Sequence, residues 1–188
     1  LGETKTAEQV LTQWEAIKQK VEGRTGKSIL DEVSKGLEPL TRAYKMQKKA
    51  AKKGFDWQSI ESVKAKVYEE LEEVREASQR LQDAKSTGDT SGSKTAADED
   101  SEPRARMSPA ERAALHLEEE FGDLLFAVVN YMRHSGIDPE TAMDRANRKF
   151  YRRFAYVEER MTKAGIPMDG DHLQDEDAFW NDAKKEGL

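Results

Sequence analysis

Proline and glycine residues divide this sequence into long segments in which apolar residues recur every three or four positions. That spacing gathers the apolar side chains on one side of an α-helix. The composition agrees, because charged and apolar residues each make up 36% of the chain and aromatic residues only 7%, a balance typical of helices with solvated faces. We therefore predict an all-α fold.

Six helices are predicted from this periodicity and from the residue types that begin and end helices. Ser108, Pro109 and Glu111 have the types expected at the N-cap, first turn and N3 position of a helix. Gly165 has the type expected just after a helix end. The six predicted helices span about residues 6–21, 39–53, 59–83, 109–134, 139–164 and 174–185.

The composition changes abruptly at residues 85–108, which contain almost no apolar side chains. Such a segment cannot bury enough surface to offset the entropy that it would lose on ordering. We expect it to form a mobile insert within one domain that spans residues 1–188. Because the chain begins at Leu1 rather than at a methionine, a missing upstream domain stays open as an alternative.

Several classes of protein are excluded or disfavoured. Cysteine is absent, which excludes disulfides, thiolate metal sites and cysteine nucleophiles. The longest apolar run, residues 124–129, is far shorter than the ~20 residues that cross a membrane, and the amino-terminal segment lacks a signal-peptide core. We expect a soluble, cytoplasmic protein with no membrane partner. The formal charge of −6 gives no reason to expect nucleic acid as the main partner.

Two predicted helices each carry a pair of carboxylates three residues apart. Glu70 and Glu73 belong to the third helix, and Glu120 and Asp123 belong to the fourth. The apolar residues 124–129 cover every side of the fourth helix and predict that it is central and buried. A carboxylate beside such a helix needs a partner, and an all-oxygen set without cysteine suits magnesium or manganese. The alternative, that these side chains only decorate solvated faces, stays open.

The fifth predicted helix offers cations for phosphate oxygens. Lys149 and Arg153 lie four residues apart at the border of its apolar stripe, so their stems can pack while their charged heads reach inward. The other arginines of this helix are expected to face water. A basic surface that only pairs with nearby glutamates is an equally weighted alternative.

These residues resemble the MazG family of nucleoside triphosphate pyrophosphohydrolases, whose mark is EExxE followed by ExxD. The motifs read EELEE at residues 69–73 and EFGD at residues 120–123. The likeness covers about residues 7–84 and 109–186 and is strongest with the carboxy-terminal of the two tandem domains in long MazG proteins. Longer stretches that resemble the family are KVYEELEEV at 66–74, LEEEFGDLLFAVVN at 117–130 and ANRKFYRRF at 146–154.

The resemblance implies a bundle of about four core helices with flanking helices, assembled as a homodimer. It also implies hydrolysis of nucleoside triphosphates to monophosphate and pyrophosphate, with Mg²⁺, or Mn²⁺ in its place, helping water attack the α-phosphorus. The implied catalytic and metal-binding residues are Glu70, Glu73, Glu120 and Asp123. The implied substrate-binding residues are Lys66, Asn130, Lys149, Arg153 and Trp180. Stacking on Trp180 would read little base identity, so broad base tolerance is expected.

Other interpretations remain. A superfamily relative specific for dUTP or phosphoribosyl-ATP and a non-enzymatic helical interaction protein both stay open. A di-iron carboxylate bundle is disfavoured, because it needs Glu-x-x-His pairs that the residues before His116 and His134 do not form. His116 lies one turn before Glu120, and a structural role is favoured for it. For Asn130 a structural role has the same weight as substrate binding.

Overall fold

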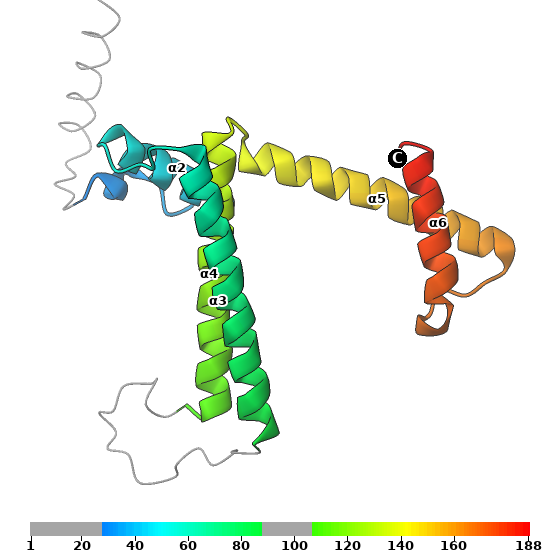
Figure 1. The fold of residues 1–188 in the computed structure, drawn as a ribbon. Helices are drawn as coiled ribbons and strands as arrows, with labels where there is room; N and C mark the ends of the chain where they lie inside the picture. Colours follow the sequence, from blue (N-terminus) through cyan, green and yellow to red (C-terminus); the bar gives the residue numbers. More distant parts are fainter. Residues whose placement is uncertain (1–27, 88–106) are drawn as a thin grey trace, which may run out of the picture. The chain divides into compact units, whose positions relative to one another are not determined.

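The computed structural model describes residues 28–87 and 107–188. Within these ranges the regular elements are all helices, which confirms the all-α prediction (Figure 1). No helix in the same ranges has an apolar stretch long enough to cross a bilayer. The predicted helix at residues 6–21 and most of the predicted insert, residues 88–106, lie outside the described residues.

Contacts divide the chain into two compact units, Leu1–Asp56 and Trp57–Leu188. In the first unit, the short 3₁₀-helix η1, Ile29–Glu32, begins with a capping box at Ser28 and was not predicted. It is followed by α2, Pro39–Lys52, which confirms the second predicted helix. An ion pair between Lys49 and Glu32 connects α2 to η1. The organisation of residues 1–188 as a single domain stays a prediction.

The second unit begins with an antiparallel helical hairpin made by α3, Ile60–Ser86, and α4, Pro109–His134. The two helices pack along one another (Figure 1). Ser59 caps the start of α3, and the predicted capping box at Ser108 starts α4. Because α3 continues to Ser86, the non-helical segment begins slightly later than predicted. Buried apolar residues of the hairpin are Val63, Val74, Ala77, Ala127 and Val129.

The described chain buries α4 on one side only. Ala127 and Val129 are buried, whereas Leu125 is 53% exposed and Phe126 is 45% exposed. The prediction that α4 is central and buried on every side is therefore wrong for the single chain. The reason is geometric, because α4 packs mainly on α3 and one neighbour covers one face of a helix. Further exposed apolar residues of the hairpin are Ile60, Tyr68, Leu71 and Phe121.

The second unit ends with α5, Pro139–Ala164, and α6, Leu173–Lys185, which pack against each other. Asp138 caps the start of α5. Gly165 ends it as predicted, with a φ of 68° in the left-handed region that favours glycine. A 3₁₀-helix, η3, Gly170–His172, precedes α6 and was not predicted. Buried residues of this helical pair are Pro139, Val157, Met161 and Ala183.

Candidate functional site

Three carboxylates from α3 and α4 meet at one point of the hairpin. One oxygen atom from each of Glu70, Glu73 and Glu120 lies within 4.8 Å of the other two. Glu70 and Glu73 are one turn apart on α3, and Glu120 faces them from α4, so the packing of the two helices unites the two sequence motifs. Glu70 is buried, Glu120 is partly buried and Glu73 is exposed. We call these three residues the carboxylate cluster.

Like charges crowd the carboxylate cluster. The pKa of Glu73 is raised, mainly because its carboxyl shares a hydrogen bond with the carboxyl of Glu70. Partial desolvation and the negative charges of Glu70 and Glu120 raise it further, while the charge of Lys66 opposes the shift. Carboxylates this close repel one another, which disfavours the charged form. A bound cation would relieve that repulsion, so the cluster has the chemistry of a metal site.

Lys66 supplies one positive charge beside the cluster. Its Nζ atom lies 2.7 Å from Glu70 Oε1 and donates to Glu69 Oε1 at 2.8 Å. The hydrogen bonds to Glu69 and then to Glu70 raise the pKa of Lys66, so it stays an ammonium group at neutral pH. Lys66 therefore partly neutralises the buried Glu70 and stands next to the predicted metal ligands.

Asp123 is the predicted ligand that the structure does not bring into the cluster. It lies one turn after Glu120 on α4, and its side chain is exposed. Within the described ranges, the carboxylates that lie close to one another are those of Glu70, Glu73 and Glu120. The assignment of Asp123 as a metal ligand stays a prediction.

Predicted substrate-binding residues of α5 and α6 form a second group. The guanidinium carbon of Arg153 lies 5.8 Å from the ring centroid of Trp180. Arg153 also donates through Nε to the carbonyl oxygen of Leu188 at 2.7 Å. Phe150 contacts Trp180 with 5.4 Å between ring centroids, and the neighbouring Lys149 is exposed. The structure thus brings Arg153 and Trp180 together, as a cation beside an aromatic surface.

Asn130 makes its recorded contacts within α4. Its Oδ1 atom accepts hydrogen bonds from Arg133 Nε at 3.1 Å and from Arg133 Nη2 at 2.8 Å. The partner is a side chain of the same helix, so this contact does not decide between a structural role and substrate binding. Substrate binding by Asn130 stays a prediction.

Two residues beside the cluster were not assigned a site role from the sequence. Nδ1 of His116 lies 3.3 Å from Glu120 Oε1. Nε2 of the same ring lies 3.2 Å from Nη1 of Arg80, which is on α3. The four-residue spacing of His116 and Glu120 is a sequence signal for the first contact. The second contact crosses between helices and has no local sequence signal.

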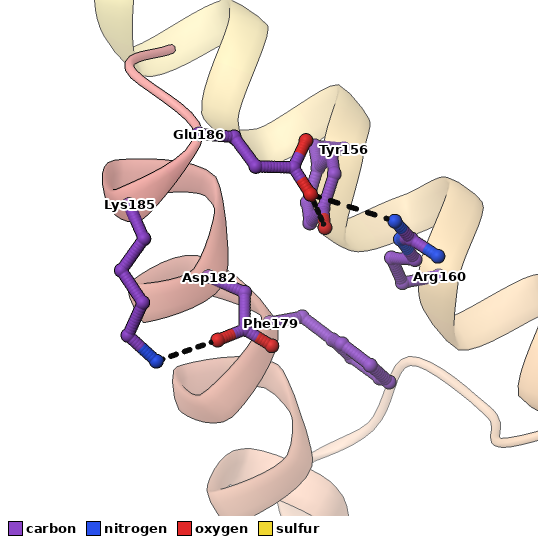
Figure 2. Close-up of a pocket in the computed structure, with 6 residues that line it drawn as sticks. All are labelled: Tyr156, Arg160, Phe179, Asp182, Lys185 and Glu186. Atoms are coloured by element: carbon purple, nitrogen blue, oxygen red, sulfur yellow. Dashed lines mark hydrogen bonds and ion pairs between the residues drawn. The ribbon is translucent and has the colours of Figure 1, made fainter.

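A surface pocket between α5 and α6 has its charges paired (Figure 2). Tyr156 donates its hydroxyl proton to Glu186 Oε1 at 2.7 Å. Arg160 lies over the Tyr156 ring, with 4.8 Å between its guanidinium carbon and the ring centroid, and 3.6 Å from Glu186. Lys185 pairs with Asp182 at 2.8 Å. Because these charges neutralise one another, the pocket has little tendency to bind a charged ligand.

Comparison with known families agrees with the two acidic motifs. Residues 58–157 match the family described as the MazG nucleotide pyrophosphohydrolase domain. The matched range is more than half of the 188 residues, and the chain belongs to this family. The range contains both acidic motifs and every predicted site residue except Trp180.

The chain is similar to three curated proteins. It is 35% identical over 181 residues to the nucleoside triphosphate pyrophosphohydrolase of Escherichia coli K12, covering 96% of this chain and 58% of that protein. It is 34% identical over 172 residues to the nucleoside triphosphate pyrophosphohydrolase/pyrophosphatase MazG of Thermotoga maritima, covering 92% and 54%. The uncharacterized protein YabN of Bacillus subtilis is 46% identical over 70 residues, covering 37% and 14%. The chain therefore spans a little over half the length of the two pyrophosphohydrolases.

Proposed function

We propose that this chain hydrolyses nucleoside triphosphates to nucleoside monophosphate and pyrophosphate, with a divalent cation held at the carboxylate cluster. The observation that carries the proposal is the meeting of Glu70, Glu73 and Glu120 within 4.8 Å. The raised pKa of Glu73 supports it, because the cluster holds unneutralised negative charge. The printed names of two relatives support the substrate class and the reaction.

The donor set of the cluster fits Mg²⁺, and Mn²⁺ would substitute for it. Both are hard cations that prefer carboxylate oxygens. The residues that would hold the ion are Glu70, Glu73, Glu120 and Asp123. When bound, the ion would neutralise phosphate charge and activate the attacking water.

The reaction forms a bond between a water oxygen and the α-phosphorus. The bond from that phosphorus to the oxygen bridging the α- and β-phosphates breaks, and pyrophosphate leaves with the bridging oxygen. The water loses its protons to solvent. Lys149 and Arg153 would bind the triphosphate and stabilise the charge that develops on the leaving pyrophosphate, with Lys66 assisting.

Base recognition would fall to Trp180. Its ring already contacts Arg153 and Phe150, so it is held in an aromatic and cationic environment. Stacking on an indole ring tolerates every base. We therefore propose broad base tolerance, with dUTP or phosphoribosyl-ATP specificity as the narrower alternative within the superfamily.

We also propose that the chain works as a homodimer. The hairpin exposes several large apolar side chains, among them Leu125 at 53% and Phe126 at 45%. Removing such surface from water gains roughly 25 cal/mol per Å², and contiguous exposed apolar patches mark interaction surfaces. A second hairpin would cover the side of α4 that α3 leaves open. Light scattering of the purified chain tests this, and a monomer at micromolar concentration would contradict it. The cytoplasmic location stays a prediction.

Product analysis tests the proposed reaction. The chain is incubated with each common nucleoside triphosphate, with dUTP and with phosphoribosyl-ATP, in the presence or absence of Mg²⁺. Chromatography and separate assays for pyrophosphate and phosphate identify the products. Mg²⁺-dependent monophosphate and pyrophosphate in equal amounts would support the proposal. No turnover of any nucleotide would favour a helical interaction protein instead.

A further inference from the structure

Four side chains form a continuous line of contacts from α3 to the carboxylate cluster. Arg80 Nη2 donates to Glu76 Oε2 at 3.2 Å within α3. Arg80 Nη1 lies 3.2 Å from His116 Nε2 across the hairpin. His116 Nδ1 then lies 3.3 Å from Glu120 Oε1. The His116 ring thus stands between a cation of one helix and a cluster carboxylate of the other.

The Arg80 contact determines where the proton of the His116 ring lies. An arginine side chain has donors and no acceptor, so Arg80 must donate and His116 Nε2 must accept. A neutral imidazole carries one proton, which therefore lies on Nδ1. That nitrogen is the one that lies 3.3 Å from Glu120 Oε1. Glu119 Oε2 is farther from the same nitrogen, at 4.0 Å.

We propose that His116, held in one tautomer and orientation by Arg80, is a positioning residue that orients Glu120 to bind the divalent cation. The inference rests on the proposed function, because Glu120 matters only if the cluster holds a metal. A carboxylate has two oxygens, so a contact through Oε1 leaves it able to bind a cation. Partners that orient metal ligands in this way typically contribute 10–100-fold to metal affinity or activity.

The first test reads the tautomer directly, in the metal-free full chain. Nitrogen NMR distinguishes a protonated from an unprotonated ring nitrogen. We expect His116 to carry its proton on Nδ1, and Arg80→Met to shift the ring toward the form protonated on Nε2. Arg75→Met is the matched control, because Arg75 is also an exposed α3 arginine paired with a glutamate of its own helix. A wild-type His116 protonated on Nε2 would overturn the inference.

The second test measures Mn²⁺ affinity by counting free Mn²⁺ with electron paramagnetic resonance. We expect His116→Ala to weaken binding about tenfold. His116→Asn restores a donor near the place of Nδ1 and is expected to recover most of the affinity. His116→Gln, whose amide reaches the place of Nε2, is expected not to. His172→Ala is the control, because His172 also contacts an acidic side chain but belongs to η3.

Turnover separates an orienting role from a structural one. If His116 acts through Glu120, raising the Mn²⁺ concentration rescues most of the lost activity of His116→Ala, and the unfolding temperature changes little. Unchanged Mn²⁺ affinity in His116→Ala, or equal rescue by Asn and Gln, would overturn the inference. A wild-type chain that binds Mn²⁺ with the expected His116 dependence but hydrolyses no nucleotide would instead overturn the proposed function alone.

Discussion

The pocket on the α5–α6 pair and the carboxylate cluster on the α3–α4 hairpin differ in how their charges are compensated. Around the pocket each acid has a basic or hydroxyl partner, as Glu186 has in Tyr156 and Arg160 (Figure 2). In the cluster, three carboxylates lie close together, and the ammonium group of Lys66 pairs with Glu70. The pKa of Glu73 is raised by its carboxylate neighbours. A pocket whose charges neutralise one another has little tendency to bind a charged ligand. A cluster with excess charge of one sign attracts a counter-ion, and on this ground we propose it as the functional site.

The largest effect is expected from removing the buried charge of the cluster. Glu70→Gln keeps the size of the side chain but takes away a predicted metal ligand, so kcat/KM should fall by about 100-fold or more. The matched control is Glu72→Gln, because Glu72 is an exposed α3 glutamate that pairs with Arg75. Steady-state hydrolysis of a triphosphate measures both variants. Equal activity of Glu70→Gln and the control would show that the excess charge of the cluster has no catalytic use.

Asp123→Asn sharpens the definition of the cluster. The proposal includes Asp123 as a ligand, although the mutually close carboxylates are the other three. We expect a loss of roughly 10–100-fold in kcat/KM and a matching loss of Mg²⁺ affinity. Glu118→Gln, an exposed position on α4, serves as the control. Activity within twofold of the control would restrict the metal site to three carboxylates.

The cations of α5 are expected to act on substrate binding. Lys149→Ala or Arg153→Ala removes a charge that is proposed to bind the triphosphate. KM should rise by about tenfold, because each variant loses one charge-assisted hydrogen bond to the substrate. Arg152→Ala is the control, since Arg152 is exposed and is expected to face water. If all three variants raise KM equally, general attraction to a basic helix would explain the effect and the assignments would fail.

Mg²⁺ should stabilise the protein in a pH-dependent way. The raised pKa of Glu73 means that its contribution to stability is present at low pH and is lost as the pH rises through the folded-state pKa. Mg²⁺ needs the deprotonated cluster, so the gain in unfolding temperature from Mg²⁺ should grow as the pH is raised. At a concentration 100 times its dissociation constant, the ion adds about 2.7 kcal/mol to the free energy of unfolding. For a chain of this size the unfolding temperature would rise by roughly 5–10 °C.

Thermal unfolding with and without Mg²⁺, across several pH values, measures this effect. Glu73→Gln should reduce the gain and flatten its dependence on pH. Glu72→Gln is again the control, because the pKa of Glu72 is lowered by its hydrogen bond with Arg75 rather than raised. If the gain in unfolding temperature from Mg²⁺ falls as the pH rises, Mg²⁺ does not bind the deprotonated cluster as proposed.

The smallest effect is expected in the compensated pocket. Arg160→Met removes an exposed charge that stacks on Tyr156 and lies near Glu186. Exposed pairs contribute little, so kcat/KM should stay within about twofold of the wild type. A tenfold loss of activity would mean that a pocket with paired charges takes part in catalysis, and charge pairing would then not distinguish it from the carboxylate cluster.

Local signals in the sequence predicted most of the described helices. The capping box at Ser108 and the left-handed Gly165 are set by residues within one turn of a helix end, so they are readable without the fold. The periodicity of α3 and α4, together with the resemblance to a known family, predicted that the two acidic motifs lie close together. These features depend on residues close in the sequence.

Other features depend on which surfaces meet, and these were missed. The apolar run in α4 predicts burial on every side, but periodicity does not say what covers a face, and Leu125 and Phe126 are exposed in the single chain. The contact of Arg80 with His116 depends on the register between α3 and α4. That register is set by packing across the hairpin and has no signature within either helix.

Hydrolysis in ¹⁸O-labelled water, followed by mass spectrometry of both products, identifies the phosphorus atom that water attacks. For the proposed reaction we expect one labelled oxygen in the monophosphate and none in the pyrophosphate, with hydrolysis requiring Mg²⁺ and nearly absent in Glu70→Gln. Label in the pyrophosphate, release of orthophosphate, or full activity of Glu70→Gln would contradict it.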